Sequence, residues 1–554
     1  MKKQRKKACM ILPPVLALAV VAGSTGAEKV SATKYLEPDL EGMDIHIVQW
    51  WDDEFENLSE PKNQFEEDLR DYRDMLQETF KFTIHTDNIG LQGEAYVEKL
   101  SSSISAGEPI GQICALEASW VPAFINAQMM APLDTLVTLV EKYRYRWPVG
   151  CDFTKEKWNK GVMEATTVGG HVYGMSTEHT PGYVIFFNKR LLQEAGYGVD
   201  ELYDLQRDGK WNWSKFEEVL QACTREAGSD GSGRTWGIAG DYVDYYTTAL
   251  YASGADPVAK TATGRFANQI DSGKVIKTLT WADEMWEKYS VPEPAETSLD
   301  RFKKGEVAMW IGEESVREEL DDLKEVLGLV MFPCPDGKEL IAVEREVVMF
   351  IPSTYDEETA KKIALAYDLL TDPVPGYEDG DVWKERYYSK YADPKAVDQT
   401  LNRMRNGRST QRLEMYVTGL QDEFENGFLR DIAGGKLHVS EAIEAHKPAW
   451  DDLIAKENAA LDDHYENVGR TEAPTEAPTE ASTTAPTEEP TEALTDAPTE
   501  AGTEEKPNET LVAPTEAASD TKGNNIWPFV ICGAVILLGA VAGVILKRSR
   551  SRKD

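Results

Sequence analysis

The chain has few basic residues for its size. Its 554 residues carry 59 lysines and arginines against 96 aspartates and glutamates, which gives a formal net charge of −37. Nucleic-acid binding needs a basic patch or stripe, and none interrupts the acidic balance of the body of the chain. We therefore expect no nucleic-acid partner, and the acidic surface by itself does not indicate a ligand.

Cysteine is scarce as well. Two of the six cysteines, Cys9 and Cys532, lie in the terminal apolar regions. The body keeps Cys114, Cys151, Cys223 and Cys334. These four are far apart, with no C-x-x-C pair and no histidine at ligand spacing, so the sequence predicts no zinc site. One disulfide and free thiols are both compatible with the pattern.

The common catalytic motifs are missing. No nucleophile elbow, phosphate-binding loop, metal-binding helix or dinucleotide fingerprint stands out. The glycine-rich run Gly228–Gly233 connects a helix to a strand, so it is not of the phosphate-binding type. A glycan-degrading enzyme needs two carboxylates about 5 Å or about 6.5–9.5 Å apart, and the sequence singles out no such pair among its acidic residues. We expect no catalytic residue, cofactor or metal.

The N-terminus predicts secretion. Met1–Lys7 is strongly basic, Met10–Ala22 is apolar, and the segment ends in the small residues Val30-Ser31-Ala32. This pattern is typical of a signal peptide, residues 1–32, with a second possible cut at Thr25–Ala27. Cys9 precedes the apolar core, so a lipoprotein signal is not expected.

The C-terminus predicts a membrane anchor. Ile526–Leu546 is 21 residues long without a charge, enough for one transmembrane helix. The basic tail 547–554 follows it and places that end in the cytoplasm, so the body lies outside the cell. No sortase motif of the Leu-Pro-x-Thr-Gly kind precedes the run, and we expect a permanent single-pass anchor.

A low-complexity segment, Thr471–Asn525, separates the body from this anchor. Its Thr-Glu-Ala-Pro repeats offer no apolar face to bury, which predicts a disordered stalk. At ~3 Å per residue in polyproline-like form, the stalk can reach on the order of 150 Å.

The body begins with alternating strands and helices. Met43–Trp51 alternates apolar and polar residues, Phe82 and Ile84 continue a second strand, and Ile110–Leu116 is a third. Helical spacing in the segments between and after them predicts β-α-β-α-β-α, a mostly parallel sheet with both faces covered. Ligands of such sheets bind beyond the carboxyl ends of the strands. The residues at those ends are Trp50, Trp51, Asp52, Glu117 and Trp120.

Five segments resemble one known family in the correct order. They are EKLSSSISAGEPIGQICAL at 98–116, GGHVYGMSTEHTPGYVIFFNKRLLQEAGY at 169–197, GKWNWSKF at 209–216, FKKGEVAMW at 302–310 and FPCPDG at 332–337. Together they resemble the bacterial extracellular solute-binding proteins, in the sugar-binding branch called family 1, which serves ATP-driven importers. Two departures are Gly111-Gln112, where the family usually has an aspartate, and the absent lipid-attachment cysteine.

The resemblance implies a periplasmic-binding-protein-like α/β fold over residues 36–470. Two lobes with mostly parallel sheets are joined by hinge strands, and 170–197 becomes the first crossing between them. We expect lobe 1 at about 36–175 and 311–372, and lobe 2 at about 176–310 and 373–470. The implied function is non-enzymatic capture of a carbohydrate, an oligosaccharide, by a monomer that delivers it to the membrane subunits of an ABC importer.

Sugars stack on flat aromatic rings and exchange hydrogen bonds with polar side chains. On this basis the expected ligand-binding residues are Trp50, Trp51, Asp52, Glu117, Trp120, Glu178, Tyr183, Tyr245, Trp310, Glu313, Arg345 and Trp383. A tryptophan is more often a core residue than a ligand platform, so this alternative stays open for each aromatic, and we expect Trp211 and Trp213 to be core. Two alternatives to transport also remain: glycan capture or sensing at the cell surface, favoured by the stalk, and the less expected secreted enzyme.

Overall fold

The computed structural model describes residues 39–52, 60–61, 63–136, 152–177, 182–227, 233–292, 294–323, 326–344, 347–377, 381, 383–388 and 390–467. The chain divides into two compact units, Met1–Ala477 and Pro478–Asp554, and all of these residues belong to the first. The predicted signal peptide, stalk, membrane span and basic tail lie outside them. In the part that the structure describes, no helix is both long and apolar enough to cross a bilayer.

The first sheet has the strand order β13-β3-β1-β2. Its strands are β1 (Met43–Gln49), β2 (Phe82–Asn88), β3 (Ile113–Glu117) and β13 (Val347–Phe350). β1 runs parallel to β2 and β3, whereas β13 pairs antiparallel with β3. The β-α-β-α-β order predicted from the sequence is therefore confirmed, and one late antiparallel strand completes the sheet.

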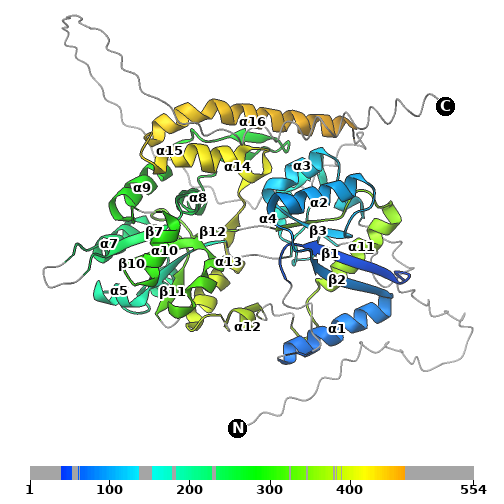
Figure 1. The fold of residues 1–554 in the computed structure, drawn as a ribbon, viewed down its shortest axis with the longest axis horizontal. Coiled ribbons are helices and arrows are strands. Elements are labelled where there is room, and N and C mark those ends of the chain that lie inside the picture. The colour runs from blue at the N-terminus through cyan, green and yellow to red at the C-terminus, as the bar shows by residue number, and fades with distance from the viewer. Residues whose placement is uncertain are drawn as a thin grey trace, which may run out of the picture. The chain divides into compact units, whose positions relative to one another are not determined.

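Alternating side chains of these strands face two different helical layers. Ile45 and Ile47 of β1 pack into a cluster with α1 and α11, whereas Val48 packs into a second cluster with α2. In Figure 1 the blue strands lie between α1 on one side and α2 on the other. The remaining elements of this part are α1 (Gln64–Phe80), α2 (Gly93–Ser105), η1 (Ala118–Trp120), α3 (Val121–Asn126), η2 (Leu133–Leu136), α4 (Lys160–Ala165), the hairpin β4 (Thr167–Val168) and β5 (His171–Val172), and α11 (Glu357–Leu370).

Gly111 explains one departure from the family pattern. A Cβ atom at this position would lie 2.5 Å from Val48 Cγ2, so only glycine lets the chain pass this close to β1. The next residue, Gln112, then accepts a hydrogen bond from the backbone N–H of His46 at 2.7 Å through its Oε1 atom. The segment at 110–112 is thus a packed approach to β3 and not part of the strand.

The second sheet has the strand order β11-β6-β10-β7. Its strands are β6 (Tyr183–Asn188), β7 (Trp236–Gly240), β10 (Val307–Glu313) and β11 (Leu327–Val330). β10 is parallel to β7, but both β10 and β11 pair antiparallel with β6. The prediction of a mostly parallel sheet is wrong here, because β6 enters the sheet from the edge at which β10 ends. Every residue of β6 is buried, as its apolar run predicts.

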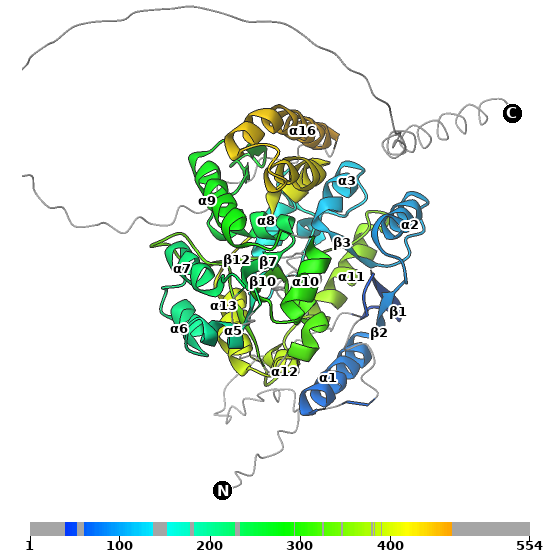
Figure 2. The same cartoon turned by 60° about the vertical axis from the view of Figure 1, so that its left-hand side comes forward.

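Helices surround this second sheet, as Figures 1 and 2 show. They are α5 (Lys189–Glu194), α6 (Glu201–Arg207), α7 (Trp213–Cys223), α8 (Tyr242–Ala252), α9 (Gly273–Tyr289), α10 (Ala295–Lys303), α12 (Trp383–Tyr388), α13 (Asn402–Asn406), α14 (Leu420–Asp422), α15 (Arg430–Ala433) and α16 (Val439–Asn467). Short 3₁₀ or π turns and small sheets complete the list: η3 (Glu314–Leu323), η4 (Ala396–Leu401), η5 (Leu413–Tyr416), η6 (Glu423–Leu429), β8 (Val258–Lys260) with β9 (Phe266–Asn268), and β12 (Ile341–Val343) with β14 (Arg408–Thr410).

The second crossing between the sheets, at which the chain returns to the first sheet, lies at another point than predicted. We call residues 39–177 and 347–377 the first lobe, and residues 182–344 and 381–467 the second lobe. The predicted return at residue 311 falls inside β10, and both β10 and β11 belong to the second sheet. The chain therefore returns from the second lobe to the first between Glu344 and Val347. The sequence prediction failed because a strand in the middle of a sheet and a strand at a crossing have the same apolar pattern.

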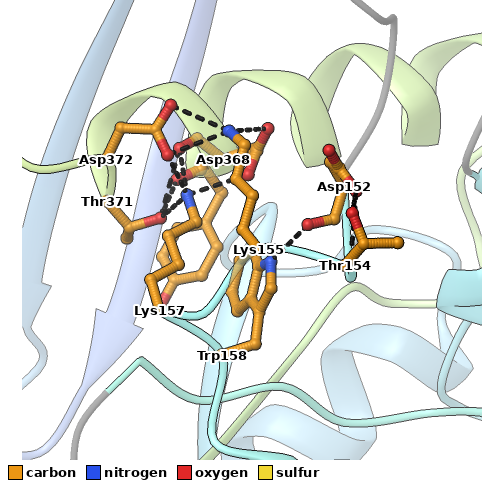
Figure 3. Close-up of polar contacts among 9 residues, drawn as sticks. Asp152, Thr154, Lys155, Lys157, Trp158, Asp368, Thr371 and Asp372 are labelled. Atoms are coloured by element: carbon orange, nitrogen blue, oxygen red, sulfur yellow. Dashed lines mark hydrogen bonds and ion pairs between the residues drawn. The ribbon is translucent and has the colours of Figure 1, made fainter.

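Lysines 155 and 157 fasten the segment before α4 to α11 (Figure 3). Lys157 Nζ lies 2.8 Å from Asp368 Oδ1 and 2.9 Å from Asp372 Oδ1, and Lys155 Nζ lies 2.8 Å from an oxygen of each carboxylate. Asp368 is 2% exposed, so this carboxylate depends on both ammonium groups to offset its desolvation.

Three of the four body cysteines are free. Cys114, Cys223 and Cys334 are buried and unpaired, and Cys151 lies outside the described residues. Burial raises the pKa of the Cys223 thiol to about 12, which keeps it protonated and unreactive at neutral pH. The sequence left open whether the body cysteines form a disulfide or remain free thiols, and these three are free thiols.

Candidate functional site

The carboxyl edges of the two sheets meet the chain crossings. Glu117 at the end of β3 pairs with Val347, the first residue of β13 after the return from the second lobe. Glu313 at the end of β10 pairs with Tyr183, the first residue of β6 after the outward crossing. Because only a few residues separate each pair from the other lobe, the two carboxyl edges lie on either side of the crossings, where ligands of open α/β sheets bind.

An aromatic cluster forms the edge of the first lobe. Trp50 follows β1, and its ring centroid lies 4.8 Å from that of Trp51, 5.3 Å from Tyr96 and 5.9 Å from Trp120. Trp50, Trp51 and Trp120 are each partly exposed, while Tyr96 is buried and donates from its hydroxyl to the Val48 and Ala115 carbonyls. The cluster offers tryptophan faces held in place by a buried tyrosine, as sugar stacking requires.

Two carboxylates flank this aromatic edge. Asp52 is exposed and accepts a hydrogen bond from Asn88 Nδ2 at 2.9 Å, which ties the loop after β1 to the end of β2. Glu117 is partly exposed at the end of β3. The structure thus brings five predicted residues, Trp50, Trp51, Asp52, Glu117 and Trp120, to one edge of the first sheet.

A buried arginine organises the edge of the second lobe. Arg412 donates from Nε to Glu414 Oε1 at 2.7 Å, from Nη1 to the Tyr183 hydroxyl at 3.1 Å and from Nη2 to Glu425 Oε1 at 2.7 Å. Glu414 is fully buried and also accepts from the Tyr251 hydroxyl. Burial raises the pKa of Tyr183 to about 12, so its phenol stays neutral and accepts the bond from Arg412.

An acidic group lies next to this arginine cluster. Asp244 belongs to the first turn of α8, directly beyond the carboxyl end of β7. Burial, with the negative charges of Asp241 and Glu313 as further causes, raises the pKa of Asp244 to about 7. A Cβ atom at Gly312 would lie 3.6 Å from Asp244 Oδ2 and 2.9 Å from Trp310 Nε1, so these two polar atoms flank the same glycine.

The two edges are in contact through one short turn. η1, which contains Trp120, contacts η5, which begins directly after Arg412. Trp120 and Leu413 also pack against the same buried cluster, which runs from Val48 in the first lobe to Phe424 in the second. The aromatic edge and the charged edge therefore belong to one surface region at the crossings.

Two predicted residues lie elsewhere. Tyr245 is fully buried between α8 and α9, where its hydroxyl donates to the Ala282 carbonyl at 3.0 Å and its ring lies 4.6 Å from Trp286. It is a core residue, so its prediction as a ligand contact is wrong. Trp383 is the first residue of α12, and its ring centroid lies 5.6 Å from that of Tyr387. Arg405 of α13 lies over the same ring, with its guanidinium carbon 5.4 Å from the ring centroid.

The remaining predicted residues divide in two groups. Trp310 and Tyr183 are only 5% and 6% exposed, so their rings offer no open face on which a sugar could stack. Glu313, next to them at the end of β10, is partly exposed. Glu178 and Arg345 lie outside the described residues. Trp211 and Trp213 are core, as expected; Trp213 stacks on Trp281 at 4.2 Å.

Sequence reasoning missed Asp244, Gly312, Arg412, Glu414 and Glu425. Asp244 carried a usable signal, since it follows the carboxyl end of a strand in the run GDYVDYY. Arg412, Glu414 and Glu425 carried none, because they reach the site from a segment more than two hundred residues beyond β6.

Comparisons with known proteins agree with this architecture. Among solved structures, the sugar-binding protein MalE of Xanthomonas citri superposes with a TM-score of 0.52 at 16% identity, covering 76% of this chain and 99% of its own. UgpB of Mycobacterium tuberculosis, in complex with glycerophosphocholine, gives a TM-score of 0.52 at 14% identity, covering 75% of this chain and 99% of its own. At such identities the likeness shows the fold alone. No curated protein sequence matches the chain.

The family is shown by sequence. The profile described as "Bacterial extracellular solute-binding protein" matches residues 71–372, which is more than half of the chain. The match includes the aromatic edge at Trp120, the first crossing and the Asp244 region. The chain therefore belongs to the bacterial extracellular solute-binding proteins, which are binding proteins and not enzymes.

Proposed function

We propose that the body captures a carbohydrate, an oligosaccharide, between its lobes and delivers it to the membrane subunits of an ABC importer. The single observation that carries the proposal is the cluster of partly exposed Trp50, Trp51 and Trp120 at the carboxyl edge of the first sheet. Flat rings at an edge that faces a polar wall suit the apolar faces and the hydroxyl rim of a sugar.

The opposite wall supplies the polar half of such a site. Asp244, Glu313 and the Arg412 cluster lie at the carboxyl edge of the second sheet, and η5 joins this wall to Trp120. A ligand that touches both walls favours the closed arrangement of the lobes, since only differential contacts shift such an equilibrium. The sugar-binding relative MalE supports this ligand class, and we assign the chain to the sugar-binding branch on the same grounds.

The cell-surface setting belongs to the same proposal. The signal peptide 1–32, the stalk Thr471–Asn525 and the membrane helix Ile526–Leu546 would hold a monomeric body outside the cell. The length of the stalk favours a second candidate, capture or sensing of glycans without transport. Deleting the importer's membrane subunits separates the two: uptake of the bound sugar ceases if the chain serves transport and is unchanged if it does not.

Calorimetric titration tests the binding itself. The compact unit that ends at Ala477, taken from residue 33, is titrated with neutral oligosaccharides of the malto-, cello-, manno- and xylo- series. We expect one series to bind with a dissociation constant on the order of micromolar, and the saccharide to be recovered intact. Hydrolysis of the saccharide, or the absence of binding by every carbohydrate tried, would reject the proposal.

A further inference from the structure

One buried carboxylate joins the two lobes beside the candidate site. Glu457 lies on α16 in the second lobe and is 3% exposed. Its Oε1 atom accepts a hydrogen bond from Asn126 Nδ2 of the first lobe at 3.1 Å. Its Oε2 atom accepts two more bonds, from the backbone N–H of Thr418 at 3.0 Å and from the Thr418 hydroxyl at 2.7 Å. A buried carboxylate needs such donors to offset its desolvation, so the loss of one of them is costly.

The donors of these bonds belong to both walls of the site. Asn126 ends α3, which begins directly after Trp120. Thr418 follows η5 by two residues, and η5 contacts η1, the turn that contains Trp120. α16 itself contacts α3, and Figure 1 shows this helix extending from the second lobe to above α3. Glu457 therefore holds the helix behind one wall and the segment behind the other wall with a single side chain.

A second polar contact between the lobes lies at α4. Lys260 ends β8 in the second lobe. Its ammonium group donates to three backbone carbonyls at the C-terminal end of the first-lobe helix α4, namely those of Glu164 at 2.9 Å, Ala165 at 3.0 Å and Thr167 at 2.8 Å. A helix leaves its last carbonyls without internal partners, and here all three N–H donors of a lysine from the other lobe supply them.

The amino end of α4 is joined to the second lobe as well. Asn159, the N-cap of α4, donates from Nδ2 to Glu344 Oε2 at 3.2 Å, and Gln411 donates from Nε2 to the same oxygen at 3.1 Å. Glu344 is 4% exposed, and Gln411 directly precedes Arg412. Polar groups of the protein itself thus join the lobes at α3 and at both ends of α4, in addition to the chain crossings.

We propose that Glu457 is a positioning residue of the binding site, which holds Asn126 and Thr418 together and so keeps the turn of Trp120 in place against η5. It acts without touching the ligand. The apparent affinity of a receptor falls with the fraction of molecules whose site is assembled, so a contact that keeps the two walls together strengthens binding. The effect on affinity rests on the proposed function, whereas the contact between the lobes can be measured without a ligand.

Exchanging the two side chains across the lobe boundary tests this role. Asn126→Asp sets a second carboxylate against Glu457 at constant size, and Glu457→Gln sets an amide against the Asn126 amide. The two changes together restore a hydrogen bond of reversed polarity, because the glutamine amide then donates to the aspartate while its oxygen still accepts from Thr418. A defect confined to α3 would not be repaired by a change on α16 in the other lobe.

Two measurements on the full-length chain in detergent micelles follow the variants. Hydrogen–deuterium exchange of residues 118–126, read by mass spectrometry without saccharide, reports on η1 and α3. Calorimetric titration with the malto-, cello-, manno- and xylo-oligosaccharides reports on the site. We expect Asn126→Asp to speed exchange and to weaken binding by about tenfold each, Glu457→Gln to act in the same direction, and the double variant to return to within about twofold of wild type.

Asn268→Asp is the matched control. Asn268 donates from Nδ2 to Asp451 Oδ1 at 2.8 Å, so this change also sets a second carboxylate against an acidic residue of α16. Both residues, however, belong to the second lobe. The control should leave the exchange of residues 118–126 and the saccharide affinity unchanged.

The outcomes separate the contact, its role and the proposed function. If the double variant did not recover, the single changes would act locally, and the inferred contact between the lobes would be overturned. Recovered exchange with wild-type affinity in every variant would leave the contact standing and overturn the positioning role. If wild type bound none of the saccharides, carbohydrate capture would be rejected and the role of Glu457 in it as well, while the exchange rates would still show whether the contact joins the lobes.

Discussion

Arg412 donates a hydrogen bond from Nη1 to the Tyr183 hydroxyl at 3.1 Å, across 229 positions of the chain. Tyr183 is the first residue of β6 after the outward crossing, and Arg412 directly precedes η5, which contacts the turn of Trp120. This one bond therefore links the start of the second sheet to the segment that closes against the first lobe. Arg412 therefore helps to fix the position of η5 relative to β6.

Replacing Arg412 should destabilise the body strongly. Arg412→Ala leaves the fully buried Glu414 carboxylate without its cation, and breaking a buried ion pair in this way costs about 3–5 kcal/mol. Urea unfolding followed by far-UV circular dichroism measures the free energy of unfolding. Tyr183→Phe removes only the 3.1 Å bond and should cost about 1 kcal/mol.

Arg412→Lys completes that series. A lysine has no planar fork with which to bond Glu414, Tyr183 and Glu425 at once, so it should recover only a small part of the lost stability. Full recovery by lysine would show that charge alone matters at this position and that the three directed bonds of the guanidinium add nothing to stability.

Asp244→Asn should stabilise the folded body at alkaline pH. The folded pKa of about 7 lies above the value of about 3.9 in an unfolded chain, so between these values the folded state binds more protons. The stability contribution of Asp244 therefore falls as pH rises from about 4 to about 7. Asparagine does not ionise and avoids this loss.

The expected size of this gain is on the order of 2 kcal/mol at pH 8, after allowance for the partial exposure of Asp244, and close to zero at pH 4.5. Thermal unfolding of wild type and variant at both pH values measures it. A variant that is less stable than wild type at pH 8 would show that the fold stabilises the ionised carboxylate of Asp244.

Local patterns predicted individual elements of both lobes well. The alternating run at Met43 became β1, and the apolar run at Tyr183 became β6 with the helix cap at Asn188, whose side chain accepts from the N–H groups of Arg190 and Leu191. These features depend on residues close in sequence, so the sequence contains the information. The lobe boundary at residue 311 failed because pairing partners decide which sheet holds β10, and pairing is a long-range property.

The candidate site divides along the same line. The sequence predicts that Trp50, Trp51, Asp52, Glu117 and Trp120 lie at one edge of the sheet, since each ends or closely follows a strand whose direction is fixed by the β-α-β rule. Tyr245 was misplaced because aromatic character does not tell which side of α8 faces α9. Arg412 was unpredictable from spacing, as its partners come from three separate parts of the chain.

The lysine network of the first lobe gives a stability prediction independent of the site. Asp368→Ala leaves Lys157, which is 9% exposed, with only the more exposed Asp372 as a carboxylate partner. Loss of this buried pairing should cost about 2–4 kcal/mol in urea unfolding. The exposed pair Arg190–Glu194 is the control: Glu194→Ala should change stability by no more than about 0.5 kcal/mol, since water already screens it. Equal effects of the two changes would mean that the network is no better desolvated than a surface ion pair.

The aromatic edge gives the sharpest test of where the ligand binds. Trp120→Ala removes a partly exposed ring at the crossings, and loss of one stacking face should weaken saccharide binding by about 1–2 kcal/mol, roughly five- to thirtyfold. Trp236→Ala is the matched control, because Trp236 is also partly exposed but lies at the amino end of β7, at the opposite edge of the sheet from Asp241. There its ring packs under the Arg234 guanidinium, whose carbon lies 3.8 Å from the ring centroid. Titration of both variants with the same neutral saccharide, after their unfolding temperatures are compared, separates a ligand contact from a packing defect. If the two variants lost affinity equally, tryptophan packing would account for the loss, and the carboxyl edges would not be where the sugar binds.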